Sequence, residues 1–159
     1  MPDGPLLPEI ARSLRSLGAS RTPCDHEAHD AVFGPLIDAR TRAASGSQEK
    51  ALAALKGASL FTRIEGAAIA AVTREVRPAP RARAFTAEAR EMLQPLQRAL
   101  AAMDDAAAHA RDGAEGWALW VDALRAAFMR ADSACEALSR MLAERDATHT
   151  PARWFKRGG

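Results

Sequence analysis

Apolar residues in the last third of the chain recur at alternating spacings of four and three. The positions are Trp117, Val121, Leu124, Phe128, Ala131, Cys135, Leu138 and Leu142. This repeat, sustained over more than three heptads, predicts one long helix with a continuous apolar stripe along one side.

The residues that flank this stripe indicate what the helix packs against. One flank is apolar, with Trp120, Ala127, Ala134 and Met141, whereas the other carries Ala118, Arg125, Asp132 and Ser139. A two-stranded coiled coil has complementary charges along its flanks. The wider apolar face therefore predicts packing inside a bundle formed by one chain. Self-association stays open as an alternative, because alanine-rich helices also pair readily.

Proline and glycine divide the remaining sequence into further helices. The ranges predicted as helical are 5–17, 25–44, 48–76, 87–111 and 114–147. Gly34-Pro35 predicts a kink or split in the second helix, and Pro95 a bend in the fourth, because proline removes a helical donor. Gly57 and Gly66 in the third helix predict close crossings between helices.

The segment between the third and fourth helices is rich in proline and arginine. Residues 77–83 predict a stiff, extended connector, because proline disfavours a helical conformation in the residue before it. Thr86 is then expected to cap the N-terminus of the fourth helix.

Composition supports closely spaced helices. The chain is 48% hydrophobic and only 5% aromatic, and much of its apolar content is alanine, the strongest helix former. Its 159 residues suffice for one domain with its own core. The predicted fold is all-α: residues 1–150 form a mostly antiparallel bundle of four main helices plus a short N-terminal helix. Residues 151–159 form a basic-aromatic C-terminal tail.

Charge, cysteine content and hydropathy restrict the class of protein. The net charge is +2, from 22 basic and 20 acidic residues, which is not typical of a dedicated nucleic-acid binder. Cys24 and Cys135 are far apart in the sequence and are expected to be unpaired thiols in a reducing compartment. With no signal-peptide pattern and no apolar run long enough to span a bilayer, the predicted location is cytoplasmic.

The densest cluster of potential metal ligands lies at the predicted start of the second helix. Residues 24–30 read Cys-Asp-His-Glu-Ala-His-Asp. His26 and His29 are spaced to chelate one ion, and His109 is the candidate third ligand from a distant helix. The favoured interpretation is a helix N-terminus with a capping residue and acids that suit the helix dipole. The metal site is kept as an alternative.

Leu55-Lys56-Gly57-Ala58-Ser59 is similar to the core of a histidine phosphotransfer domain, which is also a helical bundle. In that family the phosphorylated histidine precedes the Leu-Lys-Gly sequence by two positions. Here that position is Ala53, so the resemblance implies no phosphorelay chemistry. At most it implies a bundle that docks another protein.

The sequence lacks the usual signatures of catalysis. It contains no Gly-x-Ser-x-Gly elbow, no phosphate-binding glycine loop and no His-Glu-x-x-His pair. We therefore expect a protein that is not an enzyme and that carries no cofactor.

Two basic segments are the remaining candidates for binding. The first carries Arg74, Arg77, Arg81 and Arg83, and the second is the tail sequence Arg153-Trp154-Phe155-Lys156-Arg157. The tail has three interpretations: it folds back on the bundle, it docks into a protein partner, or it stacks on single-stranded nucleic acid.

The resulting hypothesis is a non-enzymatic helical subunit, adaptor or chaperone-like protein of a larger cytoplasmic assembly, which binds a protein partner through residues 153–157. The alternative is a small subunit of a ribonucleoprotein complex that contacts the nucleic-acid backbone through the four arginines of the first segment.

Overall fold

The computed structural model describes residues 5–17 and 22–158, with side chains described as far as Glu144. Its helices are α1 (Pro8–Ser16), α2 (His26–Ala44), α3 (Gln48–Ala54), α4 (Gly57–Glu75), α5 (Ala79–Ala110) and α6 (Ala114–Gly158). No strand occurs in the described ranges, where Pro5 and Ser47 form an isolated bridge.

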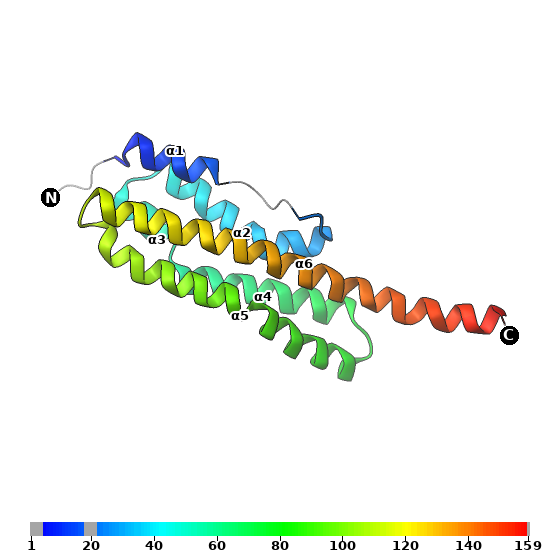
Figure 1. The fold of residues 1–159 in the computed structure, drawn as a ribbon. Coiled ribbons are helices and arrows are strands. Elements are labelled where there is room, and N and C mark those ends of the chain that lie inside the picture. Colours follow the sequence, from blue (N-terminus) through cyan, green and yellow to red (C-terminus); the bar gives the residue numbers. More distant parts are fainter. Residues whose placement is uncertain (1–4, 18–21, 159) are drawn as a thin grey trace.

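The four long helices form a closed, antiparallel bundle (Figure 1). Each of them packs against two neighbours, in the order α2, α4, α5, α6 and back to α2. Successive helices of this ring run in opposite directions. The short α1 lies across α2 and α6, and α3 connects α2 to α4 while packing on α2. The predicted all-α bundle is confirmed.

The apolar stripe of α6 faces the centre of this bundle. Its eight residues are at most 7% exposed, and the adjacent column of Trp120, Ala127, Ala134 and Met141 is buried as well. Arg125 on the opposite flank is exposed and pairs with Asp122 on the same helix, at 3.2 Å. The wide apolar face therefore packs within the chain, as its pattern predicts.

The helix predicted over 48–76 is two helices. α3 ends at Ala54, and α4 begins at Gly57. The break is stabilised from α5, because the Asp104 carboxylate accepts hydrogen bonds from the Gly57 and Ala58 N–H groups at 2.6 and 3.0 Å. These N–H groups have no acceptor within their own helix, so a carboxylate from another helix can cap the new N-terminus.

The fourth long helix begins earlier than predicted. α5 starts at Ala79, so the predicted extended connector over 77–83 and the Thr86 N-cap are wrong. Pro80 occupies one of the first two helical positions, where the N–H that it lacks would have no partner in the helix. Proline therefore starts this helix, although it ends most helices.

Three prolines lie within helices without ending them. Pro35 lies within the continuous α2, so this helix is not split, and Pro95 lies within α5. α6 likewise runs through Pro151 to Gly158, beyond the end that the sequence predicts at Ala147. A single proline removes one hydrogen bond of the helix, and the turns on either side retain theirs.

The two glycines of α4 have different environments. A Cβ at position 57 would overlap the carbonyl oxygen of Leu100, so Gly57 permits a close crossing of α4 and α5. A Cβ at position 66 would meet nothing within 4 Å. The prediction of a close crossing is confirmed for Gly57 and is wrong for Gly66.

This contrast supplies a matched pair of substitutions in one helix. Gly57→Ala should lower the free energy of unfolding by about 1–3 kcal/mol, because the new methyl group overlaps rigid backbone. Gly66→Ala should raise it by about 0.5–1 kcal/mol, because alanine favours helix at an open site. Chemical denaturation of both variants measures the two effects, and equal effects would contradict the crossing.

Candidate functional site

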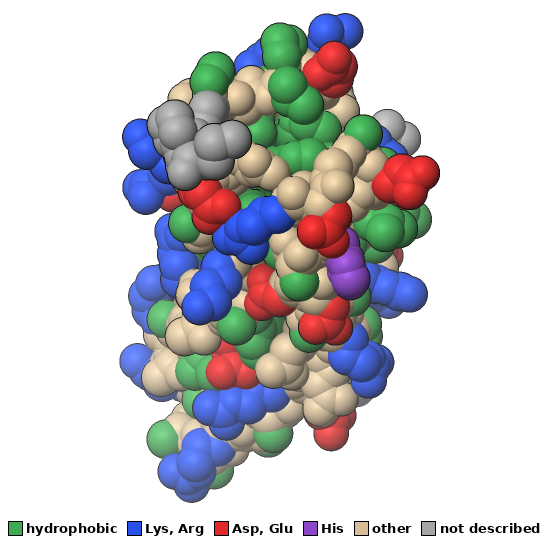
Figure 2. Space-filling view, turned by 90° about the vertical axis from the view of Figure 1, so that its left-hand side faces the viewer, with side chains coloured by type: hydrophobic (Ala, Val, Ile, Leu, Met, Phe, Trp, Pro, Cys, Tyr) green, Lys and Arg blue, Asp and Glu red, His purple; other side chains and the backbone are tan. Residues whose placement is uncertain are grey.

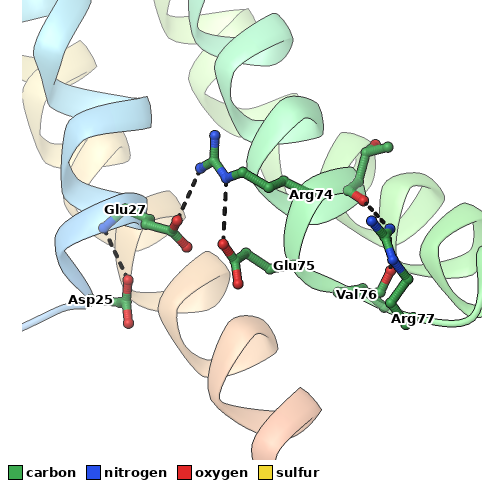
Figure 3. Close-up of polar contacts among 7 residues, drawn as sticks. Asp25, Glu27, Arg74, Glu75, Val76 and Arg77 are labelled. Carbon is green, nitrogen blue, oxygen red and sulfur yellow. Dashed lines mark hydrogen bonds and ion pairs between the residues drawn. The ribbon is translucent and has the colours of Figure 1, made fainter.

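Polar residues from three helices meet at the end of the bundle where α2 begins and α4 ends. We call this cluster the junction; it comprises Cys24, Asp25, Glu27, Arg74, Cys135 and Ser139. The Asp25 carboxylate caps α2 by accepting a hydrogen bond from the Glu27 N–H at 2.9 Å (Figure 3). The backbone N–H of Asp25 donates to Ser139 Oγ on α6 at 2.7 Å. These contacts fix the start of α2 against α6.

A disulfide bond joins Cys24 to Cys135 across the same contact. Their Cα atoms lie 6.5 Å apart, although the residues are separated by 111 positions in the sequence. The expectation of two unpaired thiols is therefore wrong, because the helical stripe that buries Cys135 also faces the segment leading into α2. The argument for a reducing compartment is lost with it, and the cytoplasmic location stays a prediction.

Arg74 connects the end of α4 to the start of α2. Its guanidinium donates to Glu27 Oε1 at 2.9 Å and to Glu75 Oε1 at 3.4 Å (Figure 3). The hydrogen bond to Glu27, together with the charge of that carboxylate, raises the pKa of Arg74 above its ordinary value. Arg77 instead donates to the carbonyl oxygens of Thr73 and Val76, which end α4.

The four arginines of the nucleic-acid hypothesis are thus used differently. Arg74 and Arg77 bind acceptors of their own chain, and the guanidinium of Arg81 lies over the Phe85 ring at 5.2 Å. Arg83 is exposed on α5. A phosphate would have to displace the acceptors of Arg74 and Arg77, and nucleic-acid binding by this set stays a prediction.

The structure separates the three histidines of the metal hypothesis. His26 lies 3.1 Å from Asp30 at the start of α2, and the ring of His29 stacks on Phe33. His109 lies near the end of α5, at the opposite end of the bundle, 3.8 Å from Asp112. Among the described residues, no group of three ligand-type side chains could hold an ion. The alternative three-histidine set is not assembled. Because α2 and α5 run in the same direction, the start of α2 and the end of α5 lie at opposite ends of the bundle.

The basic-aromatic tail belongs to the backbone of α6. The helix continues past the other helices of the bundle and projects from it (Figure 1). The side chains of Arg153, Trp154, Phe155, Lys156 and Arg157 lie outside the described residues, so their role as a binding site stays a prediction.

At the other end of the bundle, ion pairs and caps hold the helix ends together. Arg111, which follows α5, forms a two-point pair with Glu49 of α3, at 2.7 and 2.8 Å. The hydrogen bond from Arg111 lowers the pKa of Glu49 and raises that of Arg111. Side chains of both signs are spread over this end, between apolar ones (Figure 2).

A surface hollow of about 270 Å³ lies between α4 and α5. It is lined by Gly57, Ala58, Phe61, Thr62, Gln97, Ala101 and Asp104. Both oxygens of the Asp104 carboxylate bind backbone N–H groups of α4. The segment similar to histidine phosphotransfer domains lies beside this hollow, and it spans the joint between α3 and α4 instead of the interior of one helix.

Sequence reasoning missed the contacts that hold the junction together. The Asp25 cap and the exposed acids are visible in the sequence, but the Ser139 and Cys135 partners lie on a helix more than a hundred residues away. The signal that could have found them is the position of Cys135 in the buried stripe of α6, which requires a neighbour at that level.

Comparisons of the chain with protein-family models, with curated proteins and with solved structures found no match. In the part of the chain that the structure describes, none of the helices combines the length and apolarity needed to cross a bilayer.

The disulfide generates the first prediction from the junction. Reduction of the Cys24–Cys135 bond should lower the free energy of unfolding by about 2–4 kcal/mol. The bond closes a long loop in the unfolded chain, and its reduction restores the conformational freedom that this closure removes. Denaturant unfolding with and without reductant measures the difference. Cys24→Ser is the control, since its stability should equal that of the reduced protein and should not respond to reductant.

The Glu49–Arg111 pair generates a prediction on pH. The pKa of Glu49 is lower in the folded protein than in the unfolded chain, where it is about 4.3 for glutamate. The ionised carboxylate therefore stabilises the folded protein above the unfolded-state pKa, and this stabilisation is lost as the pH falls through the folded-state pKa. Glu49→Gln should therefore lower the melting temperature at pH 7 and have little effect at pH 3. Glu91→Gln on the exposed side of α5 is the control; if it behaved as Glu49→Gln does, the pair would not be the cause.

Proposed function

We propose that this protein is a non-enzymatic helical adaptor that binds a protein partner through the C-terminal part of α6. The observation that carries the proposal is the division of this helix into two parts. Its buried stripe continues to Leu142, and the helix then runs on from Ala143 to Gly158, past the end of the bundle (Figure 1). The core described up to this point is closed by helices of the same chain.

The composition of the helical extension supports a protein partner. Residues 153–157 place Trp and Phe beside two arginines and a lysine. Tryptophan and arginine are the residue types most enriched among those that dominate binding energy at protein interfaces. In a short segment of this kind, the aromatic side chains contribute binding energy and the charges contribute specificity.

The roles of the conspicuous polar residues also favour an adaptor over an enzyme. Asp104 caps α4, Arg74 pairs with Glu27, and Arg77 binds the last carbonyl groups of α4. Each of these groups is used to hold helix ends together. An acid–base or nucleophilic mechanism needs a group that is positioned toward a substrate.

Removal of residues 151–159 tests the proposal. The truncated protein should keep its melting temperature and lose its partner, because the buried core precedes the deleted segment. The protein is purified gently from its native source, and its mass is measured by light scattering together with its absorbance. The complete chain should elute with a co-purifying protein, and the truncated chain should elute alone.

Two further variants distinguish a specific binding site from nonspecific hydrophobic binding. The double variant Trp154→Ala with Phe155→Ala should abolish co-purification. Met129→Ser should not, because Met129 is 66% exposed on the solvent side of α6, in the part of the helix that belongs to the bundle. A large loss of melting temperature on truncation would mean that the tail stabilises the bundle. An ultraviolet absorbance spectrum that shows co-eluting nucleic acid would instead favour the ribonucleoprotein alternative.

A further inference from the structure

The two cysteines of the junction differ in their exposure to solvent. Cys135 is 0% exposed and lies in the apolar stripe of α6. Cys24 is only partly buried and lies in the short segment before α2. A reagent that approaches from solvent therefore meets Cys24 before Cys135, which is covered by the core.

Noncovalent contacts also join the segments that carry the two cysteines. The Asp25 N–H donates to Ser139 Oγ at 2.7 Å, and these residues are the immediate neighbour of Cys24 and the residue one helical turn after Cys135. The ion pair between Glu27 and Arg74, at 2.9 Å, ties the same turn of α2 to α4. We expect these contacts to keep both thiols within reach of one another in the reduced protein.

We propose that Cys24 and Cys135 form a thiol–disulfide exchange site, in which Cys24 reacts with an external disulfide and Cys135 resolves the product. The co-reactant class is a small disulfide such as oxidised glutathione. The exchange forms or breaks the covalent bond between the start of α2 and α6. Cys135 lies two helical turns before Leu142, so this bond is at the base of the α6 extension. This inference does not depend on the identity of a protein partner.

The exchange proceeds in two balanced steps. The Cys24 thiolate, its proton released to solvent, attacks one sulfur of oxidised glutathione, and the glutathione S–S bond breaks to release one glutathione thiolate. Cys135 then attacks the Cys24 sulfur of this mixed disulfide, and the bond between Cys24 and glutathione breaks. The proton of the Cys135 thiol passes to the departing glutathione thiolate. Two protein thiols are oxidised, and one molecule of oxidised glutathione is reduced to two thiols. Excess reduced glutathione reverses both steps.

The order of attack is tested on the reduced wild-type chain. A short pulse of a thiol-alkylating reagent under native conditions, followed by peptide mapping, should label Cys24 about tenfold or more faster than Cys135. Equal rates, or faster labelling of Cys135, would overturn the assigned roles. Because no residue is replaced, this measurement does not depend on the folding of a variant.

Single-cysteine variants test the intermediate. Incubated with oxidised glutathione, Cys135→Ser should accumulate a glutathione adduct on Cys24, whereas folded Cys24→Ser should leave Cys135 unmodified. Wild type should pass through a transient adduct to a monomer without free thiols. Glutathionylation of Cys135 at the rate seen for Cys24 would contradict the proposal, as would a wild-type chain that stays a dithiol at every ratio of oxidised to reduced glutathione.

Ser139→Ala tests whether the hydrogen bond to Asp25 aligns the thiols. The variant should need a several-fold more oxidising glutathione buffer for half-formation of the disulfide, while Ser133→Ala, on the exposed side of the same helix, should match the wild type. If Ser139→Ala also matches the wild type, the hydrogen bond between Asp25 and Ser139 does not align the thiols. If this series fails while the complete chain still binds its partner, the exchange site alone is rejected. If the truncated chain keeps its partner, the proposed adaptor function is rejected and the exchange site is unaffected.

Discussion

Burial of the wide apolar face of α6 is the constraint on which the arrangement of the other helices depends. A single stripe could be covered by one neighbour, but the second column, from Trp120 to Met141, requires another. α5 and α2 therefore pack on either side of α6, and α4 closes the ring between them. Trp120 shows how strongly packing dominates: its buried indole N–H has no hydrogen-bond acceptor among the described residues, at a cost of about 1–3 kcal/mol. Full burial of the ring and its edge-to-face contact with Trp117, at 5.1 Å, offset that cost.

Once apolar burial has brought the helices together, a few polar contacts decide where the helices begin and end. Asp104 supplies from α5 the acceptors that the first turn of α4 lacks, and this allows α3 and α4 to be separate helices. Asp25 does the same within α2 and also ties that helix to Ser139. These contacts contribute about 1–2 kcal/mol each by comparison with known caps, much less than the apolar core. Their effect is on geometry, because they fix the helix ends to particular neighbours.

The sequence predicts what depends on local periodicity and misses what depends on distant partners. The stripe of α6, its apolar flank and the start of α2 at Asp25 follow from spacing and capping rules, and all three are confirmed. The break after Ala54 depends on the carboxylate of Asp104, more than forty residues away in the sequence. The disulfide of Cys24 likewise depends on Cys135, 111 residues away. The sequence places Pro80 in an extended connector, although it starts α5, because proline either starts or ends a helix depending on whether its position needs an N–H. The proposed binding residues of the tail are an inference from composition, and no periodicity identifies them.

The position of the junction relates the stability of the bundle to the part of α6 that leaves it. Among the side chains described, the last buried ones of α6 lie within two turns of Cys135 and Ser139, both of which are held by the segment that starts α2. Fraying of a helix proceeds from its end toward its last firm contacts, and here those contacts are covalent and hydrogen-bonded as well as apolar. The projecting turns therefore have a fixed base. A segment that emerges as a helix from such a base loses less conformational freedom on binding than a free peptide does, because its first turns are already ordered. The same contacts that close the core are thus consistent with the proposed role of the α6 extension.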